Sequence, residues 1–332
     1  MKGASGGGHA AGRLHVGGTY KLPRVGNGTD FDDSVEPDSD PDGFYTAEFV
    51  RRIVDYYGTH DGFLAGHASR IRFVEERTLP ELVRYVGPLD GLRVLDVGCG
   101  TASSTVALRD AGAQIDGFDV DGEAVSIGRA RLAEHGFNDV VLHAGADLDA
   151  AGVPRGCFDL VYMNAVIEHV PSRHRARMLA DAAARLRPGG HFVIAQSPNR
   201  WWPRDVYLTG LWLLPWMPAG SRMAALYAST CGRVKDSVPR TAAGARELER
   251  RGVPGITYRG VLKALPQGTR CVNCGPEHRT SSMATTVASR RRRTVERVVG
   301  TLITPMAKVP VAAFGPMFSL LVFCLPGGPP AV

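Results

Sequence analysis

Short apolar segments alternate with longer amphipathic ones between residues 93 and 196, and this alternation constrains the fold more than any other feature. Apolar runs predict five strands, at Arg93–Val97, Gln114–Val120, Val140–His143, Phe158–Asn164 and His191–Gln196. Apolar residues at helical spacing predict the helices between them, at Ser103–Ala111, Gly122–His135 and Ser172–Leu186. Strands that alternate with helices form a parallel sheet covered on both faces. We therefore predict an α/β fold with a doubly wound, Rossmann-like sheet.

The chain outside this alternation is less regular. Residues 1–43 combine a Gly-, Ala- and His-rich stretch with an acidic one, and they predict a disordered tail that buries too little apolar surface to fold. Helical spacing is present at Phe44–Tyr57 and Gly66–Tyr85, and Pro188-Gly189-Gly190 predicts the stop before the fifth strand. The nine apolar residues Met317–Leu325 are too few to span a membrane and predict a buried strand.

The net charge of +6 is unevenly distributed. Residues 232–332 carry 16 basic and 5 acidic side chains, with Arg290–Arg293 as the densest point. Such basic runs bind nucleic acid or anionic lipid in some proteins, but a solvated loop is the commoner case. No recognised nucleic-acid motif accompanies this one, so a nucleic-acid partner is not expected. The six cysteines are irregularly spread and no signal peptide is visible, which predicts reduced thiols in a cytoplasmic protein.

The first predicted strand runs into Gly98-Cys99-Gly100-Thr101-Ala102, at the edge where open α/β sheets bind ligands. Two glycines two residues apart let the backbone approach a ligand closely. A dinucleotide fingerprint requires a third glycine where this chain has Ser103. Asp96, two residues before the first glycine, repels a pyrophosphate and can accept from an ammonium group. The loop therefore favours a ligand that is cationic at this end.

The second predicted strand ends in acids. A carboxylate at this position accepts hydrogen bonds from both ribose hydroxyls of NAD or of an adenosyl ligand. We assign this role to Asp119 and predict that Asp121 caps the helix that follows.

Four elements together resemble the class I S-adenosylmethionine-dependent methyltransferases, with the closest likeness to the small-molecule branch of quinone and natural-product methyltransferases. In the order and spacing of that family they are Val94-Leu95-Asp96-Val97-Gly98-Cys99-Gly100-Thr101, Asp119, Phe158-Asp159-Leu160-Val161 with Glu168-His169-Val170, and Leu186-Arg187-Pro188-Gly189-Gly190. The resemblance covers about residues 66–200. Ala102 stands where the family often has a third glycine, and it is small enough to permit binding. The family closes its sheet with an antiparallel final strand, a place that Met317–Leu325 fits.

The resemblance implies S-adenosylmethionine as the cofactor and a set of contacts to it. Asp96, Gly98 and Gly100 would surround the methionyl end, and Asp119 the ribose. Asp147 would accept from the adenine amino group, unless it is only a turn carboxylate. The cofactor-binding candidates on matching positions are Asp96, Gly98, Cys99, Gly100, Asp119, Val120, Asp147 and Asn164, with Ala165 also beside the sulfonium.

An oxygen nucleophile needs its proton removed before or during methyl transfer. His169 follows the fourth predicted strand on the ligand edge, and an unperturbed imidazole titrates near neutrality. It is the candidate catalytic base. The Glu-His pair also braces the loop beneath the ligand in many family members, and both roles remain open at this point.

All four tryptophans fall within sixteen residues, at Trp201, Trp202, Trp212 and Trp216. The family often places a substrate-side cap after the fifth strand, so residues 199–231 are predicted to cover a hydrophobic or aromatic acceptor. A helical hairpin packed on the core and an interfacial anchor at a membrane surface are the alternatives.

Cys271, Cys274 and His278 have the spacing of metal ligands, but a closed zinc site needs a fourth ligand and only Cys231 is near in sequence. We predict no metal. The expected organisation is a disordered tail (1–43), a cofactor-binding core with N-terminal helices (44–198), an aromatic-rich cap (199–250), and a basic loop with closing strands (251–332).

The leading hypothesis is a methyltransferase that uses S-adenosylmethionine and acts on a small, hydrophobic or aromatic acceptor, at oxygen rather than at nitrogen or carbon. One alternative is an NAD-dependent oxidoreductase, against which Asp96 and the missing third glycine count. Another is a non-catalytic adenosyl-binding protein whose basic tail contacts nucleic acid or membrane. The expected location is cytoplasmic, with weak membrane-surface association as an open alternative; the oligomeric state is not predicted.

Overall fold

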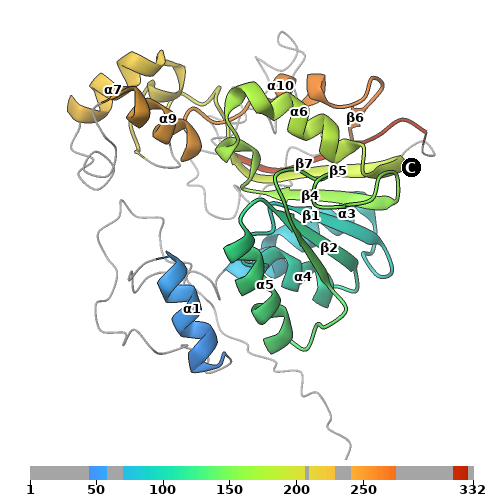
Figure 1. Cartoon of the computed structure of the whole chain (residues 1–332). Coiled ribbons are helices and arrows are strands. Elements are labelled where there is room, and N and C mark those ends of the chain that lie inside the picture. The colour runs from blue at the N-terminus through green and yellow to red at the C-terminus, as the bar shows by residue number, and fades with distance from the viewer. Residues whose placement is uncertain (1–44, 58–69, 206–208, 229–240, 274–316, 328–332) are drawn as a thin grey trace, which may run out of the picture.

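A seven-stranded sheet forms the centre of the protein, with strand order β3-β2-β1-β4-β5-β7-β6 (Figure 1). The computed structural model describes residues 45–57, 70–205, 209–228, 241–273 and 317–327. The strands are β1 (Arg93–Val97), β2 (Gln114–Asp119), β3 (Val141–Ala144), β4 (Phe158–Asn164), β5 (Leu186–Pro198), β6 (Arg270–Cys271) and β7 (Met317–Cys324). β1 to β5 pair in parallel, whereas β7 runs antiparallel to both β5 and β6. The predicted fold class is confirmed, including the antiparallel closing strand.

Helices cover both faces of this sheet. They are α1 (Ala47–Tyr57), α3 (Leu79–Val86), α4 (Ser103–Asp110), α5 (Gly122–Glu134), α6 (Ser172–Ala183), α7 (Ala219–Ala228), α9 (Ala242–Arg250) and α10 (Tyr258–Ala264), with the short helical turns η1 (Val74–Thr78), η2 (Ile167–His169) and η3 (Leu214–Trp216). Figure 1 shows α6 and α10 together on one side of the sheet, and α4 and α5 on the other.

The two cores explain why the strand sequences are almost continuously apolar. Val94 of β1 packs with Leu82 of α3 and Leu108 of α4 on one face. Its neighbour Leu95 faces the opposite core, which contains Leu179 of α6. Because successive strand side chains point to opposite faces, a strand buried on both faces needs apolar residues at consecutive positions.

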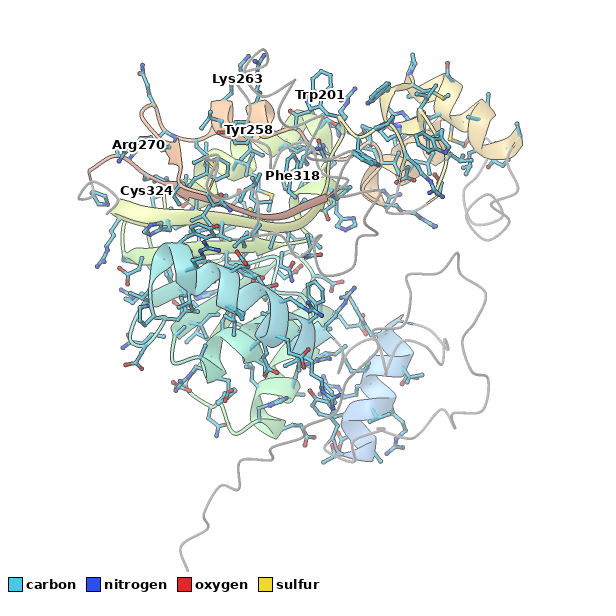
Figure 2. The ribbon with its side chains drawn as sticks, turned by 180° about the vertical axis from the view of Figure 1, so that it is seen from behind. Trp201, Tyr258, Lys263, Arg270, Phe318 and Cys324 are labelled. Carbon is cyan, nitrogen blue, oxygen red and sulfur yellow. The ribbon has the colours of Figure 1, made fainter. Side chains whose placement is uncertain are left out.

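β7 lies where the nine-residue apolar run predicted a strand. Its Phe323 pairs with Phe192 of β5 and is fully buried. Figure 2 shows the strand from behind, with Phe318 and Cys324 along it and Arg270 of β6 beside it. In the described ranges, no helix is both long enough and apolar enough to cross a bilayer.

β5 begins earlier than predicted. The sequence Pro188-Gly189-Gly190 was expected to stop the preceding helix and to separate it from a strand at His191. Instead, α6 ends at Ala183, Leu186 already pairs with Phe158, and the register then shifts so that His191 pairs with Leu160. Gly189, with φ of +78°, lies in this bulge. The glycines therefore bend a strand rather than end a helix.

The predicted helix at Gly66–Tyr85 is interrupted as well. Residues Val74–Thr78 form a π-helical turn that leads directly into α3. Such turns are rare and frequently occur near functional sites, and this one packs against α4, the helix that follows the glycine loop.

The segment predicted to form a cap has a small core of its own, formed by Leu214, Leu226, Leu248 and Val253. None of the four tryptophans belongs to that core. Trp201, Trp212 and Trp216 are 61%, 64% and 50% exposed, and Figure 2 shows Trp201 on the side of α10, near Tyr258 and Lys263. The division of the chain into tail, core, cap and basic loop stays a prediction, and its predicted tail lies outside the described residues.

The cysteines differ from expectation at one position. Cys271 is disulfide-bonded, whereas Cys99, Cys157 and Cys324 are free thiols. The prediction of six reduced thiols is therefore wrong for Cys271, because cysteine spacing alone does not fix the redox state. Cys231, Cys274, His278 and Arg290–Arg293 lie outside the described residues. Within the part that the structure describes, no three His, Cys, Asp or Glu side chains are grouped so as to hold a metal ion.

Candidate active site

Parallel strands end at the same edge of a sheet, so the segments that follow β1, β2, β3 and β4 gather there. This edge carries the glycine loop, the acids after β2, the turn with Asp147 and the loop with His169. Every cofactor-binding candidate from the sequence lies at the end of one of these strands or in the segment that follows it.

The glycine loop is fastened to β2 by backbone hydrogen bonds. The amides of Gly98 and Cys99 donate to the carbonyl of Phe118, at 2.7 and 3.0 Å. Gly98 has φ of +78°, and a Cβ there would lie 2.4 Å from a methyl carbon of Val166. Gly100 also has positive φ, but a Cβ on it would meet no atom within 4 Å. Positive φ favours glycine at both positions of the loop. At Gly98 a side chain would also collide with Val166, whereas Gly100 faces open space.

Asp119 is held in a fixed orientation at the end of β2. Its Oδ2 accepts from the amide of Gly100 at 2.8 Å, and its Oδ1 accepts from the amide of Asp121 at 2.9 Å. Burial raises the pKa of Asp119, while these amide donors act in the opposite direction. Each carboxylate oxygen keeps a second lone pair, so two ribose hydroxyls can still donate to it.

Asp121 takes the capping role predicted for it. Its Oδ1 accepts from the amides of Glu123 and Ala124, at 2.9 and 3.2 Å, and it begins α5. Between the two acids, the apolar side chain of Val120 is 68% exposed. An exposed valine beside a ribose-type carboxylate suits the apolar face of a purine.

Asp96 lies beneath the loop in a fully buried position. Its Oδ2 accepts from the hydroxyl of Thr105, in α4, at 2.7 Å. Burial raises the pKa of Asp96 to about 7. Tyr162 is its neighbour in the β1–β4 pairing and is also fully buried. Sequence reasoning missed Tyr162, because nothing in the chain marks it apart from a strand tyrosine in the core.

The other cofactor candidates are placed unevenly. Asn164 ends β4, and its amide nitrogen donates to the hydroxyl of Ser104 at 3.0 Å. The side chain of Cys99 packs in the core, so Cys99 contributes its backbone to the surface of the glycine loop. Asp147 caps its own turn by accepting from the amide of Ala150 at 2.8 Å, and it lies 3.6 Å from Arg177. These contacts are those of a turn carboxylate, and an adenine contact for Asp147 stays a prediction.

His169 is fixed by a backbone carbonyl from a distant part of the chain. Its Nδ1 lies 2.7 Å from the carbonyl oxygen of Arg250, in the last turn of α9. A carbonyl oxygen can only accept, so Nδ1 carries the proton and the neutral ring has its lone pair on Nε2. Nε2 lies 4.0 Å from Oε1 of Glu168, and the His169 side chain is 41% exposed.

Further contacts tie the loop after β4 to α9 and to Gly255, which follows α9. Arg175 donates to the carbonyls of Glu168 and Val170 within the loop, and to Gly255 outside it, at 2.5 to 2.8 Å. Glu249 of α9 accepts from the amide of Ser172 at 2.8 Å. Sequence reasoning missed the contacts with Gly255 and Glu249 because they join residues 80 and 77 positions apart.

Glu168 is the buried member of the Glu-His pair. Its Oε2 accepts from the hydroxyl of Ser197, in β5, at 2.8 Å, while Oε1 has no hydrogen-bond partner. Burial raises the pKa of Glu168, and the neighbouring His169 acts in the opposite direction. The carboxyl therefore braces two strand ends and remains available to the imidazole.

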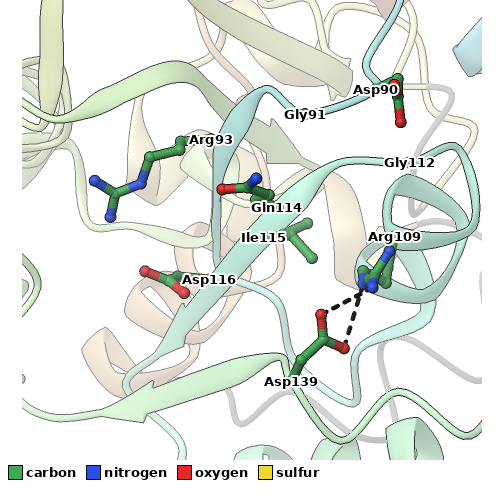
Figure 3. A pocket seen from close by; sticks show the side chains of 9 residues that line it. All are labelled: Asp90, Gly91, Arg93, Arg109, Gly112, Gln114, Ile115, Asp116 and Asp139. Carbon is green, nitrogen blue, oxygen red and sulfur yellow. Dashed lines mark hydrogen bonds and ion pairs between the residues drawn. The ribbon is translucent and has the colours of Figure 1, made fainter.

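A pocket lies at the opposite edge of the sheet, with a volume of about 530 Å³ (Figure 3). It lies where β1 and β2 begin and is lined by polar side chains, among them Arg93, Asp116 and the ion pair of Arg109 with Asp139. Ligands of open α/β sheets bind at the carboxyl ends of the strands. This pocket is therefore not the candidate active site.

Comparison with known proteins points to the same class of enzyme as the geometry of the site. Residues 94–190 match the family described as "Methyltransferase domain". A ubiquinone biosynthesis O-methyltransferase of Thiobacillus denitrificans is 30% identical over 198 residues, which are 58% of this chain and 76% of that protein. The chain belongs to the class I S-adenosylmethionine-dependent methyltransferases. The two alternative functions, an NAD-dependent oxidoreductase and a non-catalytic adenosyl-binding protein, find no support in these comparisons.

Other relatives match over less of their length. The ubiquinone biosynthesis O-methyltransferase of Aromatoleum aromaticum is 37% identical over 112 residues, 34% of this chain and 46% of that protein. The chain thus spans about half the length of several curated relatives. Similar solved structures include a methyltransferase from Mesorhizobium loti, 27% identical over 38% of this chain and 54% of that one, TM-score 0.32. Another is the magnesium protoporphyrin IX methyltransferase of Synechocystis with bound SAH, 24% identical over 48% and 68%, TM-score 0.34.

The residues of this site fit S-adenosylmethionine, the cofactor of this methyltransferase. The methionyl part of that cofactor is cationic at its sulfonium and its ammonium, and Asp96 lies at the end of β1, beneath the glycine loop. A dinucleotide would instead bring a pyrophosphate to this loop, whereas Asp119 suits the ribose of either ligand. The open space at Gly100 and the exposed Val120 complete a place for the adenosyl group.

The raised pKa of Asp96 gives the methyltransferase a specific pH dependence. The folded pKa of about 7 exceeds the usual value of 3.8, so this carboxyl stabilises the fold below pH 3.8 and the stabilisation is lost as the pH rises through 7. Relative to Asp96→Asn, the free energy of unfolding of the wild type should fall by roughly 2–4 kcal/mol between pH 4 and pH 8. Urea unfolding across this range measures the difference, and parallel profiles would contradict it.

Proposed function

We propose that this methyltransferase transfers a methyl group to an oxygen atom of a small, hydrophobic or aromatic acceptor. The observation that carries the proposal is the fixed tautomer of His169, which holds a basic nitrogen at the carboxyl end of β4. The names of the relatives support the choice of oxygen, since they are described as O-methyltransferases of ubiquinone biosynthesis.

Three groups of this chain are proposed to hold the donor. Asp119 accepts from the ribose hydroxyls, because its carboxylate is already oriented by two amides. Asp96 faces the ammonium group, and Asn164 borders the sulfonium at the end of β4. When bound, S-adenosylmethionine supplies a methyl group that is activated as part of a sulfonium cation.

His169 is proposed to receive the proton of the acceptor hydroxyl at Nε2. Protonation makes the ring a cation, and the Oε1 of Glu168, 4.0 Å away and buried, then stabilises that charge. Glu168 plays this role as a carboxylate, and the hydroxyl of Ser197 holds the other carboxylate oxygen, Oε2, in place. The chain therefore supplies alignment and a base, while exclusion of water falls to the cap.

Removing the ribose carboxylate tests the donor site. Asp119→Ala should weaken binding of S-adenosylhomocysteine by roughly 2–3 kcal/mol, because a carboxylate that holds two hydroxyls is lost. Titration calorimetry without acceptor measures this directly. Unchanged affinity would move the ribose contact to another residue.

Replacing the imidazole tests the base. His169→Gln should lower kcat at least tenfold and leave the dissociation constant of S-adenosylhomocysteine within a few-fold of wild type. The assay follows transfer of labelled methyl from S-adenosylmethionine to a panel of catechols and phenols. Normal turnover of the variant would show that no base acts at this position, and a carbon, nitrogen or pre-ionised acceptor would replace the proposal.

The exposed tryptophans support two roles, which we propose as a cap over the acceptor and, second, a contact with the membrane surface. Trp216 donates from its indole nitrogen to the carbonyl of Arg200 at 2.9 Å, and the guanidinium of Arg204 lies 6.0 Å from the ring of Trp212. Exposed aromatic rings with nearby arginines suit either an apolar acceptor or the interface of an anionic bilayer.

One pair of measurements separates these roles. In the variant Trp212→Ala with Trp216→Ala, a cap predicts a raised KM for a water-soluble phenol and unchanged sedimentation with phosphatidylglycerol vesicles. A membrane contact predicts the reverse. Val141→Ser, which removes another exposed apolar side chain at the far edge of the sheet, is the matched control and should change neither quantity. A variant that matches wild type in both would contradict both roles.

A further inference from the structure

The helix α1 packs along α5 (Figure 1). Phe49 and Ile53 of α1 form a buried cluster with Ile127 of α5. Around this cluster, Arg52 donates to the hydroxyl of Ser126 at 3.0 Å, and the Tyr45 hydroxyl lies 2.9 Å from Nε2 of His135. These contacts hold the helix but touch none of the proposed donor residues.

The last turn of α1 differs, because it reaches the acids after β2. The hydroxyl of Tyr56 donates to Oδ2 of Asp121 at 2.7 Å. The other oxygen of Asp121 caps α5, and its amide donates to Asp119. A continuous series of hydrogen bonds therefore runs from Tyr56 through Asp121 to the carboxylate proposed to hold the ribose, and on to Gly100.

Geometry gives this series a function. Asp119 and Asp121 are carboxylates on one short turn, and the amide of Asp121 donates to Oδ1 of Asp119, so the position of one acid bears on that of the other. The Tyr56 hydroxyl donates to the carboxylate of Asp121 and holds it toward α1. This hydrogen bond is the main reason why the pKa of Asp121 lies below its usual value. The turn is thereby fixed with Asp119 in place and Val120 exposed between the two acids.

We propose that Tyr56 is a positioning residue for the methyl donor: from α1 it fixes the turn Asp119–Asp121 that receives the ribose. This inference rests on the proposed donor site. Nothing in the sequence near residue 56 indicates such a role, because the contact joins residues 65 positions apart.

The test is calorimetric and needs no acceptor. Wild type and Tyr56→Phe are titrated with S-adenosylhomocysteine and with its 2′-deoxyribose analogue. Tyr56→Phe should weaken binding of S-adenosylhomocysteine about fivefold, the effect of one hydrogen bond. The affinity lost on removing the 2′-hydroxyl should also be smaller in Tyr56→Phe than in wild type, because the carboxylate that receives this hydroxyl is no longer fixed.

Ser126→Ala is the matched control, since it removes a hydrogen bond in the same helix interface and leaves the turn intact. It should bind both ligands as wild type does. Asp121→Asn, which keeps a helix cap but weakens the acceptor for Tyr56, should give an intermediate loss. Thermal unfolding of all variants shows whether α1 docking has changed.

Equal losses for the two ligands in Tyr56→Phe, or equal behaviour of Tyr56→Phe and Ser126→Ala, would overturn the inference and reduce Tyr56 to a structural contact. Failure of the proposed function has another signature. A wild type that binds S-adenosylhomocysteine but methylates no oxygen acceptor contradicts the acceptor proposal only. A wild type that does not bind it overturns the donor site and this inference with it.

Discussion

The carboxylate of Asp119 accepts backbone hydrogen bonds from Gly100 and Asp121, and the rest of the proposed donor site depends on this pair of bonds. The first bond joins the loop after β1 to the turn after β2, and the second holds the turn itself. The approach is close because Gly128 of α5 has no side chain, and a Cβ there would lie 3.1 Å from Ala102 and 3.3 Å from the carbonyl of Gly100. The glycines and the acid are therefore parts of one packed unit.

The same unit places two carboxyl groups where they are largely buried. Asp96 and Asp119 both lie where burial raises the pKa of a carboxyl group, and no lysine or arginine forms an ion pair with either among the described contacts. Buried carboxyls without a cation cost stability in the ionised form. S-adenosylmethionine carries an ammonium and a sulfonium group, so the proposed donor site would bring a cationic ligand to these buried carboxyls.

The acceptor side is organised by a different constraint. The loop that carries His169 is held by Arg250 and Glu249 of α9 and by Gly255, about 80 residues further along the chain. The end of α9 and Gly255 therefore fix the tautomer of His169 and hold the N-terminal end of α6. The proposed cap and the imidazole thus share these contacts.

The sequence by itself determined the sheet, its parallel strands, the strand that closes it and the candidates Asp96, Gly98, Gly100 and Asp119. These follow from local rules: apolar periodicity fixes which segments are strands, and parallel strands must end at one edge. Even there, the bulge at Gly189 escaped prediction, because a glycine pair stops a helix or bends a strand according to its pairing partner. Only the tertiary structure decided the tautomer of His169, the exposure of the tryptophans and the contact of Tyr56 with Asp121. The two contacts join residues 65 or more positions apart, and the exposure of a side chain depends on what packs over it. Neither kind of information leaves a pattern along the chain.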